Sequence, residues 1–191
     1  MSSLNAEHPI KSAPLRLGQA QQCMLLDLTD LPRLGFRGTQ SAEYLAARGF
    51  TLPQAPNRAV PQSDGSHVAR LSQTEYFILG SLQDNGERIA DEEARWELDH
   101  SANYLLPRHD SHAWLQLSGE RIADVMAKLC GVDLRPKAFG AGAVAQTSAA
   151  RINVIVINVG GEDQPTFQIL FDRASLEYFK GAVLDAMAEF N

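Results

Sequence analysis

The sequence predicts an α+β fold in which mainly antiparallel sheets have helices packed on one face. Two observations support this class. Residues 112–190 show a strand, a helix with an apolar stripe, three strands and a second such helix, an order typical of helices covering one face of an antiparallel sheet. The 191 residues are 45% hydrophobic and 21% charged, which suits one large domain or two small lobes that share a core.

The first predicted elements are short. Residues 1–20 are polar and are expected to form a flexible N-terminal arm. The apolar run "CMLLDLTDL", residues 23–31, predicts a strand. A short helix is expected over residues 41–48, and Gly49 is a plausible end for it because glycine commonly follows the last turn of a helix.

The middle of the chain separates two predicted lobes. Strands are expected at residues 68–71 and 75–80. Residues 84–99 carry seven carboxylates and two arginines; a metal or acid–base site is one interpretation, but we favour a solvated helix or linker because charge-dense runs are usually exposed. We therefore expect one domain over residues 21–191, made of a lobe at 21–83, a linker up to 105 and a lobe at 106–191.

The second lobe has the clearest periodicity. "HAWLQLS" places Ala113, Leu115 and Leu117 on one face of a strand, and Ser118 is predicted to cap the next helix. The nearly continuous apolar run at residues 152–159 predicts a strand covered on both faces. Both predicted helices repeat apolar residues at helical spacing: Ile122, Val125, Met126, Leu129 and Cys130 in the first, and Leu176, Phe179, Val183, Ala186, Met187 and Phe190 in the second.

The segment "LPRLGFRG", residues 31–38, has two interpretations. Glycines and arginines ahead of a helix can bind an anion if the glycine amides converge at the helix N-terminus. Alternatively, Leu34 and Phe36 point inward from a short strand that ends in a turn. We favour the strand, with Arg33 and Arg37 on one face about 13 Å apart and ion-paired to carboxylates of the fold or of a partner.

No other segment predicts a catalytic residue or a metal ligand. His109 and His112 in "HDSH" have a spacing that can bind metal on a helix. In an extended segment, side chains three residues apart point to opposite faces, so a structural role is favoured. "GAGAVAQ", residues 140–146, looks like a phosphate loop, but it precedes a predicted strand where a phosphate loop precedes a helix, so we expect a turn.

Composition narrows the class of partner. The formal net charge is -6 and no basic stripe with interleaved aromatics occurs, so nucleic-acid binding is not expected. No apolar run reaches the ~20 residues of a membrane span and the N-terminus has no signal-peptide pattern; we therefore expect a cytoplasmic protein that does not bind membranes. The two cysteines, Cys23 and Cys130, are far apart in sequence, and Cys130 is expected in the core.

The proline-rich loop at residues 51–61 is predicted to be a contact surface for a partner. Its apolar residues Leu52, Pro53, Pro56 and Val60 belong to no obvious helical or strand face. Apolar side chains that a fold leaves exposed as a patch commonly mark a protein interface.

Three stretches taken together resemble one family. They are "LTDLPRLGFRGTQSAEYLAARGFTLPQAPNRA", "ARLSQTEYFILG" and "LQLSGERIADVMAKLCGVDLRPKAFGAGAVAQT". Their "PR-x-G-x-RG", "PN", "SG", "C-x-x-DL-x-P-x-x-F-x-x-G" and "QT" elements occur in the order seen in the gamma subunit of heterotetrameric sarcosine oxidase. The resemblance spans nearly the whole chain from about residue 25.

The resemblance implies a truncated form of the fold of the aminomethyltransferase, or T-protein, of glycine cleavage. It also implies a non-catalytic subunit of an enzyme that oxidises sarcosine to glycine and passes the one-carbon unit to tetrahydrofolate. A free-standing folate-dependent aminomethyltransferase-like protein is the alternative, but the chain has about half the length of such an enzyme.

The same resemblance implies partners and cofactors. The partners are two large flavoprotein subunits of alpha and beta type and a small zinc-binding subunit. FAD, FMN, NAD and zinc are expected only in those partners, and tetrahydrofolate is possible for the complex. Arg33, Arg37, Asn57 and Arg58 are the candidate residues for binding or partner contact.

Overall fold

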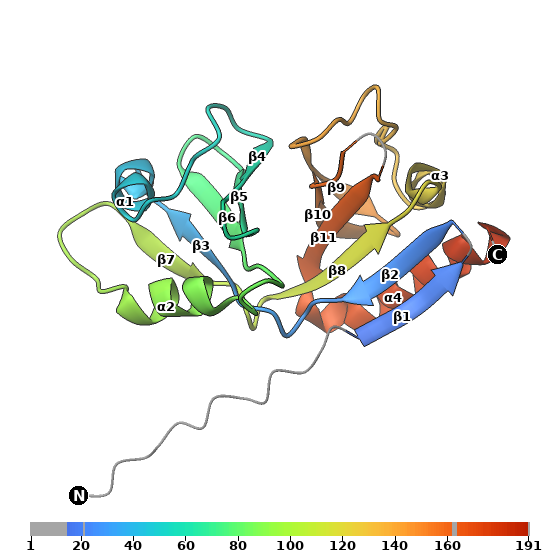
Figure 1. Ribbon diagram of the computed structural model, residues 1–191, viewed down its shortest axis with the longest axis horizontal. Coiled ribbons are helices and arrows are strands. Elements are labelled where there is room, and N and C mark those ends of the chain that lie inside the picture. The colour runs from blue at the N-terminus through green and yellow to red at the C-terminus, as the bar shows by residue number, and fades with distance from the viewer. Residues whose placement is uncertain (1–14, 21, 162–163, 191) are drawn as a thin grey trace, which may run out of the picture.

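Two antiparallel sheets lie side by side in the computed structural model, each with its own helices (Figure 1). The structure describes residues 15–20, 22–161 and 164–190. The large sheet has six strands in the order β1-β2-β8-β11-β10-β9. These strands are β1 Leu15–Ala20, β2 Cys23–Asp27, β8 His112–Ser118, β9 Val144–Ala149, β10 Ile152–Asn158 and β11 Thr166–Asp172.

The small sheet has five strands in the order β4-β5-β6-β3-β7. They are β3 Arg33–Arg37, β4 Arg58–Pro61, β5 His67–Arg70, β6 Glu75–Leu79 and β7 Tyr104–Pro107. Helices α1 Ser41–Ala47 and α2 Glu87–Arg95 lie with the small sheet, and α3 Ile122–Ala127 and α4 Leu176–Met187 lie with the large one (Figure 1). Short 3-10 turns, Arg173–Ser175 and Ala188–Phe190, flank α4.

Three apolar layers hold these elements together. The first joins one face of the large sheet to α3 and α4, and includes Leu115, Val156 and Phe179. The second lies between the two sheets, where Trp114 and Phe77 are buried. The third joins the small sheet to α1 and α2. The predicted α+β fold, with helices on one face of each antiparallel sheet, is therefore confirmed.

The strand and helix patterns of the second half form as predicted. Ala113, Leu115 and Leu117 of β8 are buried against the helices. Strand β10 contributes Val154 to that layer and Ile157 to the layer between the sheets. It is covered on both faces, which explains its nearly continuous apolar sequence.

The division into lobes differs from the prediction. Residues 15–20 form β1 and pair with β2, so the predicted arm ends earlier; residues 1–14 lie outside the described part. Strand β2 also pairs with β8, so it belongs to the large sheet, although it precedes the small one in sequence. An apolar pattern predicts a strand but not its partner, since pairing is decided by contacts far apart in the chain.

The predicted linker also contains regular structure. Helix α2 buries Ile89 against the small sheet, and Glu92 is only 8% exposed because it pairs with Arg48 at 3.3 Å. Strand β7 follows it and pairs with β3. Helix α3 begins after Arg121 without a side-chain cap, so Ser118 is not its cap. Within the described residues, no helix has the length and apolarity needed to span a membrane.

Candidate functional site

Within the described residues the chain crosses between its two sheets twice, and the crossings lie next to each other. The first leads from the end of β2 at Asp27 to the start of β3 at Arg33, and the second from Pro107 of β7 to His112 of β8. Both lie at the base of the two lobes in Figure 1. The side chain of Thr29 in the first crossing bonds to both backbone groups of Trp114 on β8.

Arg33 links the two crossings. It is fully buried, and its guanidinium donates to the carbonyls of Thr29 at 2.7 Å and Leu31 at 2.9 Å in the first crossing. It also donates to the carbonyls of His109, at 2.9 Å, and His112 in the second crossing. Burial, and to a smaller extent Arg173, lower the pKa of Arg33 to about 10, so it is charged at neutral pH.

The two histidines of "HDSH" are part of this second crossing. The His112 ring lies edge-on to Phe77 with centroids 5.4 Å apart. Burial first, and then the charges of Arg108 and Arg33, lower the pKa of His112 to about 4, so its ring is neutral near pH 7. Burial likewise lowers the pKa of His109. The described residues include no group of three or more His, Cys, Asp and Glu arranged to hold a metal ion.

The structure decides between the two interpretations of "LPRLGFRG". It forms strand β3 with Leu34 and Phe36 buried, as predicted. The expected ion pairs within the fold are wrong, because among the described residues neither Arg33 nor Arg37 has a carboxylate within ion-pair distance; Arg33 bonds to carbonyls and Arg37 is exposed. Gly38 allows close packing, since a Cβ there would lie 1.9 Å from the Ala102 carbonyl oxygen.

Asn57 and Arg58 lie at a second junction between the sheets, at the end of the small sheet where β5 and β6 separate β4 from β3. Asn57 adopts a left-handed conformation, with φ 58°. Its backbone donates to Arg70 of β5 and accepts from Val144 of β9, and its side-chain oxygen accepts from Gln146 of β9 at 2.8 Å. Of the four predicted candidate residues, Arg33 lies at the first junction, and Asn57 and Arg58 lie at the second. Arg37 lies at the opposite end of β3 from the first junction, paired with Glu75 and Tyr104.

An open groove lies on the inner face of the large sheet beside the second junction. Its volume is about 780 Å³, and its walls include Gln146, Arg151, Leu170 and Asp172. The rest of the lining is mixed, because hydroxyl and amide side chains such as Thr147 and Asn153 alternate with apolar ones such as Ile155. Asp172 already accepts a hydrogen bond from the backbone of Ala174.

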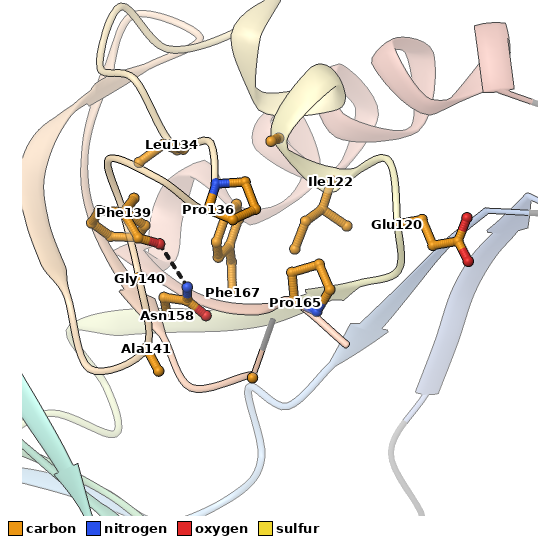
Figure 2. Close-up of a pocket in the computed structure, with 12 residues that line it drawn as sticks. Glu120, Ile122, Leu134, Pro136, Phe139, Gly140, Ala141, Asn158, Pro165 and Phe167 are labelled. Atoms are coloured by element: carbon orange, nitrogen blue, oxygen red, sulfur yellow. Dashed lines mark hydrogen bonds between the residues drawn. The ribbon is translucent and has the colours of Figure 1, made fainter. Parts of the chain in front are cut away.

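A second hollow lies between α3 and the loop before β9 (Figure 2). Leu134, Phe139 and Pro165 are among its mostly apolar walls, and Asn158 donates to the Phe139 carbonyl at 2.8 Å beside it. Its volume is about 40 Å³, far below the several hundred Å³ that a cofactor or drug-sized ligand fills.

Comparison with known proteins gives the family. No family model matches the chain. It is 30% identical over 167 residues to the sarcosine oxidase subunit gamma of Corynebacterium sp. strain U-96, covering 83% of this chain and 76% of that protein. The chain belongs to the sarcosine oxidase gamma subunit family. A subunit gamma from Arthrobacter sp. is 26% identical, with 97% and 89% covered.

Solved structures agree with this family. The heterotetrameric sarcosine oxidase of Corynebacterium sp. U-96, solved with pyrrole 2-carboxylate, contains a chain with a TM-score of 0.70 and 25% identity, matching 92% of this chain and 88% of that one. Aminomethyltransferase T from Bartonella henselae has a TM-score of 0.62 at 14% identity, covering 85% of this chain and 45% of that one. The predicted truncated aminomethyltransferase-like fold is confirmed.

The loop predicted as a partner surface is packed within the small lobe. Pro53 is buried, and Leu52 and Val60 contact the apolar layer under the small sheet. Gln62 holds the loop there, because its side-chain amide bonds to both backbone groups of Thr51 at 2.9 Å. The prediction that this loop is a partner surface was therefore wrong, because the small sheet covers its apolar side chains.

Sequence reasoning missed Gln146 and Arg151. Gln146 lies in the "QT" pair that belongs to the family resemblance, so its position was noted without a role. The signal for Arg151 is the two-residue turn "AR" between two predicted strands, where asparagine and glycine are usual. Both turn residues have positive φ, 47° at Ala150 and 68° at Arg151.

Proposed function

We propose that the chain is a non-catalytic gamma-type subunit of a heterotetrameric sarcosine oxidase that oxidises sarcosine to glycine and transfers the one-carbon unit to tetrahydrofolate. The observation that carries this proposal is the extent of the structural match. It covers 92% of this chain and 88% of a chain of that oxidase, so the resemblance is to a whole chain of the assembly.

The use of the polar residues at the two junctions supports a non-catalytic role. Catalytic groups must face the reacting atoms within hydrogen-bond reach. Arg33 donates to backbone carbonyls and Gln146 to Asn57 and the Leu71 carbonyl. The neutral His112 bonds to Ser111 and packs on Phe77. These groups hold the two sheets together.

The proposal assigns the cofactors to the partner chains. FAD, FMN and NAD would be bound by two large alpha- and beta-type subunits, and zinc by a fourth small subunit. Tetrahydrofolate would be used by the complex as a whole. The principal cavities of the described residues are an open groove of mixed lining and a hollow of about 40 Å³, and neither is an enclosed cofactor-sized pocket, which favours a role in assembly. The complex would work in the cytoplasm.

Purification of the chain with an affinity tag, from its native cell at endogenous level, tests the proposal. We expect two large flavoprotein chains and a small zinc-containing chain in equal amounts, a flavin absorbance spectrum, and peroxide formation that depends on sarcosine. The same chain produced alone is the control and should be colourless after gel filtration. Recovery of the native chain without flavoprotein partners would overturn the assignment.

A free-standing folate-dependent protein is the second candidate. It is favoured by 25% identity over 179 residues to an aminomethyltransferase of Saccharopolyspora erythraea. The chain covers 47% of that enzyme, so it would supply only part of an active site built by the full length. Calorimetric titration of the isolated chain with tetrahydrofolate separates the two: measurable binding favours this candidate, and none favours the subunit.

A further inference from the structure

The outer edge of β9 has unpaired backbone groups in its middle. Strand β9 is the last strand of the large sheet and pairs with β10 on one side only. At its start Val144 donates to the Asn57 carbonyl at 3.1 Å, and just beyond its end Ala150 donates to the Leu129 carbonyl at 2.8 Å. These two amides therefore point outward, away from β10.

Gln146 and Ser148 have the same orientation as Val144 and Ala150, because backbone groups in an antiparallel strand alternate between its two sides. On the outer side neither amide donates to another described residue and the Gln146 carbonyl accepts from none, whereas the Ser148 carbonyl belongs to the bridge between Cys130 and Ala149. Both residues are exposed. The amides of Gln146 and Ser148 and the carbonyl of Gln146 are therefore available at strand spacing, and β9 lacks the lysines and prolines that usually protect an edge.

The fold keeps this edge open. Arg58 forms a bridge with Ala143, and the amide of the left-handed Asn57 donates to the Arg70 carbonyl of β5 instead of continuing along β9. Arg70 holds that loop elsewhere by donating to the carbonyls of Pro53 and Gln54. At the other end Cys130 bridges Ala149. The free stretch between the two bridges is about 10 Å long, enough for three or four extended residues.

The surroundings of the edge indicate the chemistry of what binds there. Arg58 and Arg151 lie near its two ends, are exposed, and have no carboxylate within ion-pair distance among the described residues. The strained turn that carries Arg151 is fixed by a hydrogen bond from the Tyr178 hydroxyl to the Ala150 carbonyl at 2.9 Å. Tyr178 itself is 56% exposed. The edge thus offers backbone pairing flanked by cations.

We propose that a partner subunit adds an extended segment of three or four residues, carrying at least one carboxylate, to β9 at Gln146–Ser148. Its backbone would pair with the free amides of Gln146 and Ser148 and with the Gln146 carbonyl, as in recognition by strand addition, and its carboxylate would contact Arg151 at the groove. A second copy of the chain is disfavoured, since two-fold pairing of the same edge would bring the arginines of both copies together. The inference rests on the proposed function, which supplies the partner.

Two substitutions at one position test the pairing in the assembled complex. Ser148→Pro removes the outward amide, which has no partner among the described residues, and proline is tolerated on edge strands. Ser148→Ala keeps the amide and is the matched control. We expect Ser148→Pro to weaken association with the flavoprotein subunits at least ten-fold at unchanged secondary structure, and Ser148→Ala to assemble as the wild type does. Assembly of the proline variant at wild-type affinity would overturn the proposal.

A second pair tests the charge, and hydrogen exchange locates the contact. Arg151→Glu is expected to weaken assembly about ten-fold, whereas Arg151→Lys keeps the charge and should lose little. The amides of Gln146 and Ser148 should exchange more slowly in the complex than in the free chain. If these amides exchange equally fast in the intact complex and in the free chain, the contact at β9 is refuted while the proposed function stands. Failure of wild-type chain to assemble refutes the proposed function, and protection that grows with the concentration of the free chain shows self-association instead.

Discussion

The two junctions between the sheets use opposite chemistry. At the first, the buried charged side chain of Arg33 donates to carbonyls of both crossings. At the second, the exposed neutral pair Asn57 and Gln146 joins β4 to β9. Leaving buried donors and acceptors unpaired costs far more than losing a hydrogen bond in water. The first junction should therefore determine stability, and the second mainly the shape of the surface beside β9.

The largest expected effect follows loss of the Arg33 guanidinium. Arg33→Met fills a similar volume but leaves the carbonyls of both crossings without their donor, so we expect a loss of about 4 kcal/mol in the free energy of unfolding. Arg33→Lys retains a charge but not the planar fork, and should recover only part of the loss. Urea unfolding of the three proteins measures this. Wild-type stability in the methionine variant would show that the crossings do not need the guanidinium.

The pH dependence of the first junction is the next largest effect. The pKa of His112 is about 4 in the folded chain, against about 6.5 for an unfolded histidine. Between these values the unfolded chain binds more protons, so the free energy of unfolding falls as pH drops from about 6.5 to 4. We expect a loss of about 2 to 3 kcal/mol over this range.

Replacement of His112 by glutamine checks the source of this dependence. His112→Gln has no titrating ring and should show a much flatter stability profile between pH 6.5 and 4 in urea unfolding. His109, whose pKa is also lowered, will leave a smaller residual slope. An unchanged profile in the variant would assign the dependence to other groups.

The roles that the structure gives to Arg33 and His112 differ from those predicted from the sequence, because burial depends on contacts between residues that are distant in the chain. The pattern of Leu34 and Phe36 predicted strand β3 from neighbouring residues alone. That Arg33 faces inward depends on the turn at residues 108–111, which lies more than seventy residues away. An arginine beside a glycine is compatible with an ion pair, an anion site or carbonyl bonding, and only the packed fold distinguishes them.

The same limit explains the errors about pairing and surface. The run at residues 23–31 predicted a strand, which forms over Cys23–Asp27 only, and its partner β8 follows it by about ninety residues. The apolar residues of the 51–61 loop were predicted to be exposed because they follow no strand or helix periodicity. In the fold, Gln62 holds the loop in place and the small sheet covers these residues. Motif order, in contrast, is a one-dimensional property, and it predicted the family correctly.

The second junction should show a moderate effect that depends on backbone conformation. Asn57→Ala loses the bond to Gln146 and places an alanine at φ 58°, so we expect a loss of about 1 to 2 kcal/mol in stability. Asn57→Gly loses the same bond but accepts the conformation, and should cost less. Thermal unfolding compares them. A glycine variant as unstable as the alanine variant would show that the hydrogen bond dominates.

The smallest effect is expected at Arg37, the residue that shares strand β3 with Arg33. Its side chain is exposed at the end of the strand, and the described residues place no carboxylate within ion-pair distance of it. Exposed substitutions away from caps and networks usually change stability by less than about 0.5 kcal/mol. Arg37→Ala should therefore unfold at nearly the same urea concentration as the wild type, in contrast to Arg33→Met four residues earlier.

A loss comparable to that of Arg33→Met would mean that Arg37 has a partner that this fold does not show. Weaker assembly with the flavoprotein subunits at unchanged stability would instead make Arg37 a contact residue, so unfolding and assembly measured on the same variant separate the two roles.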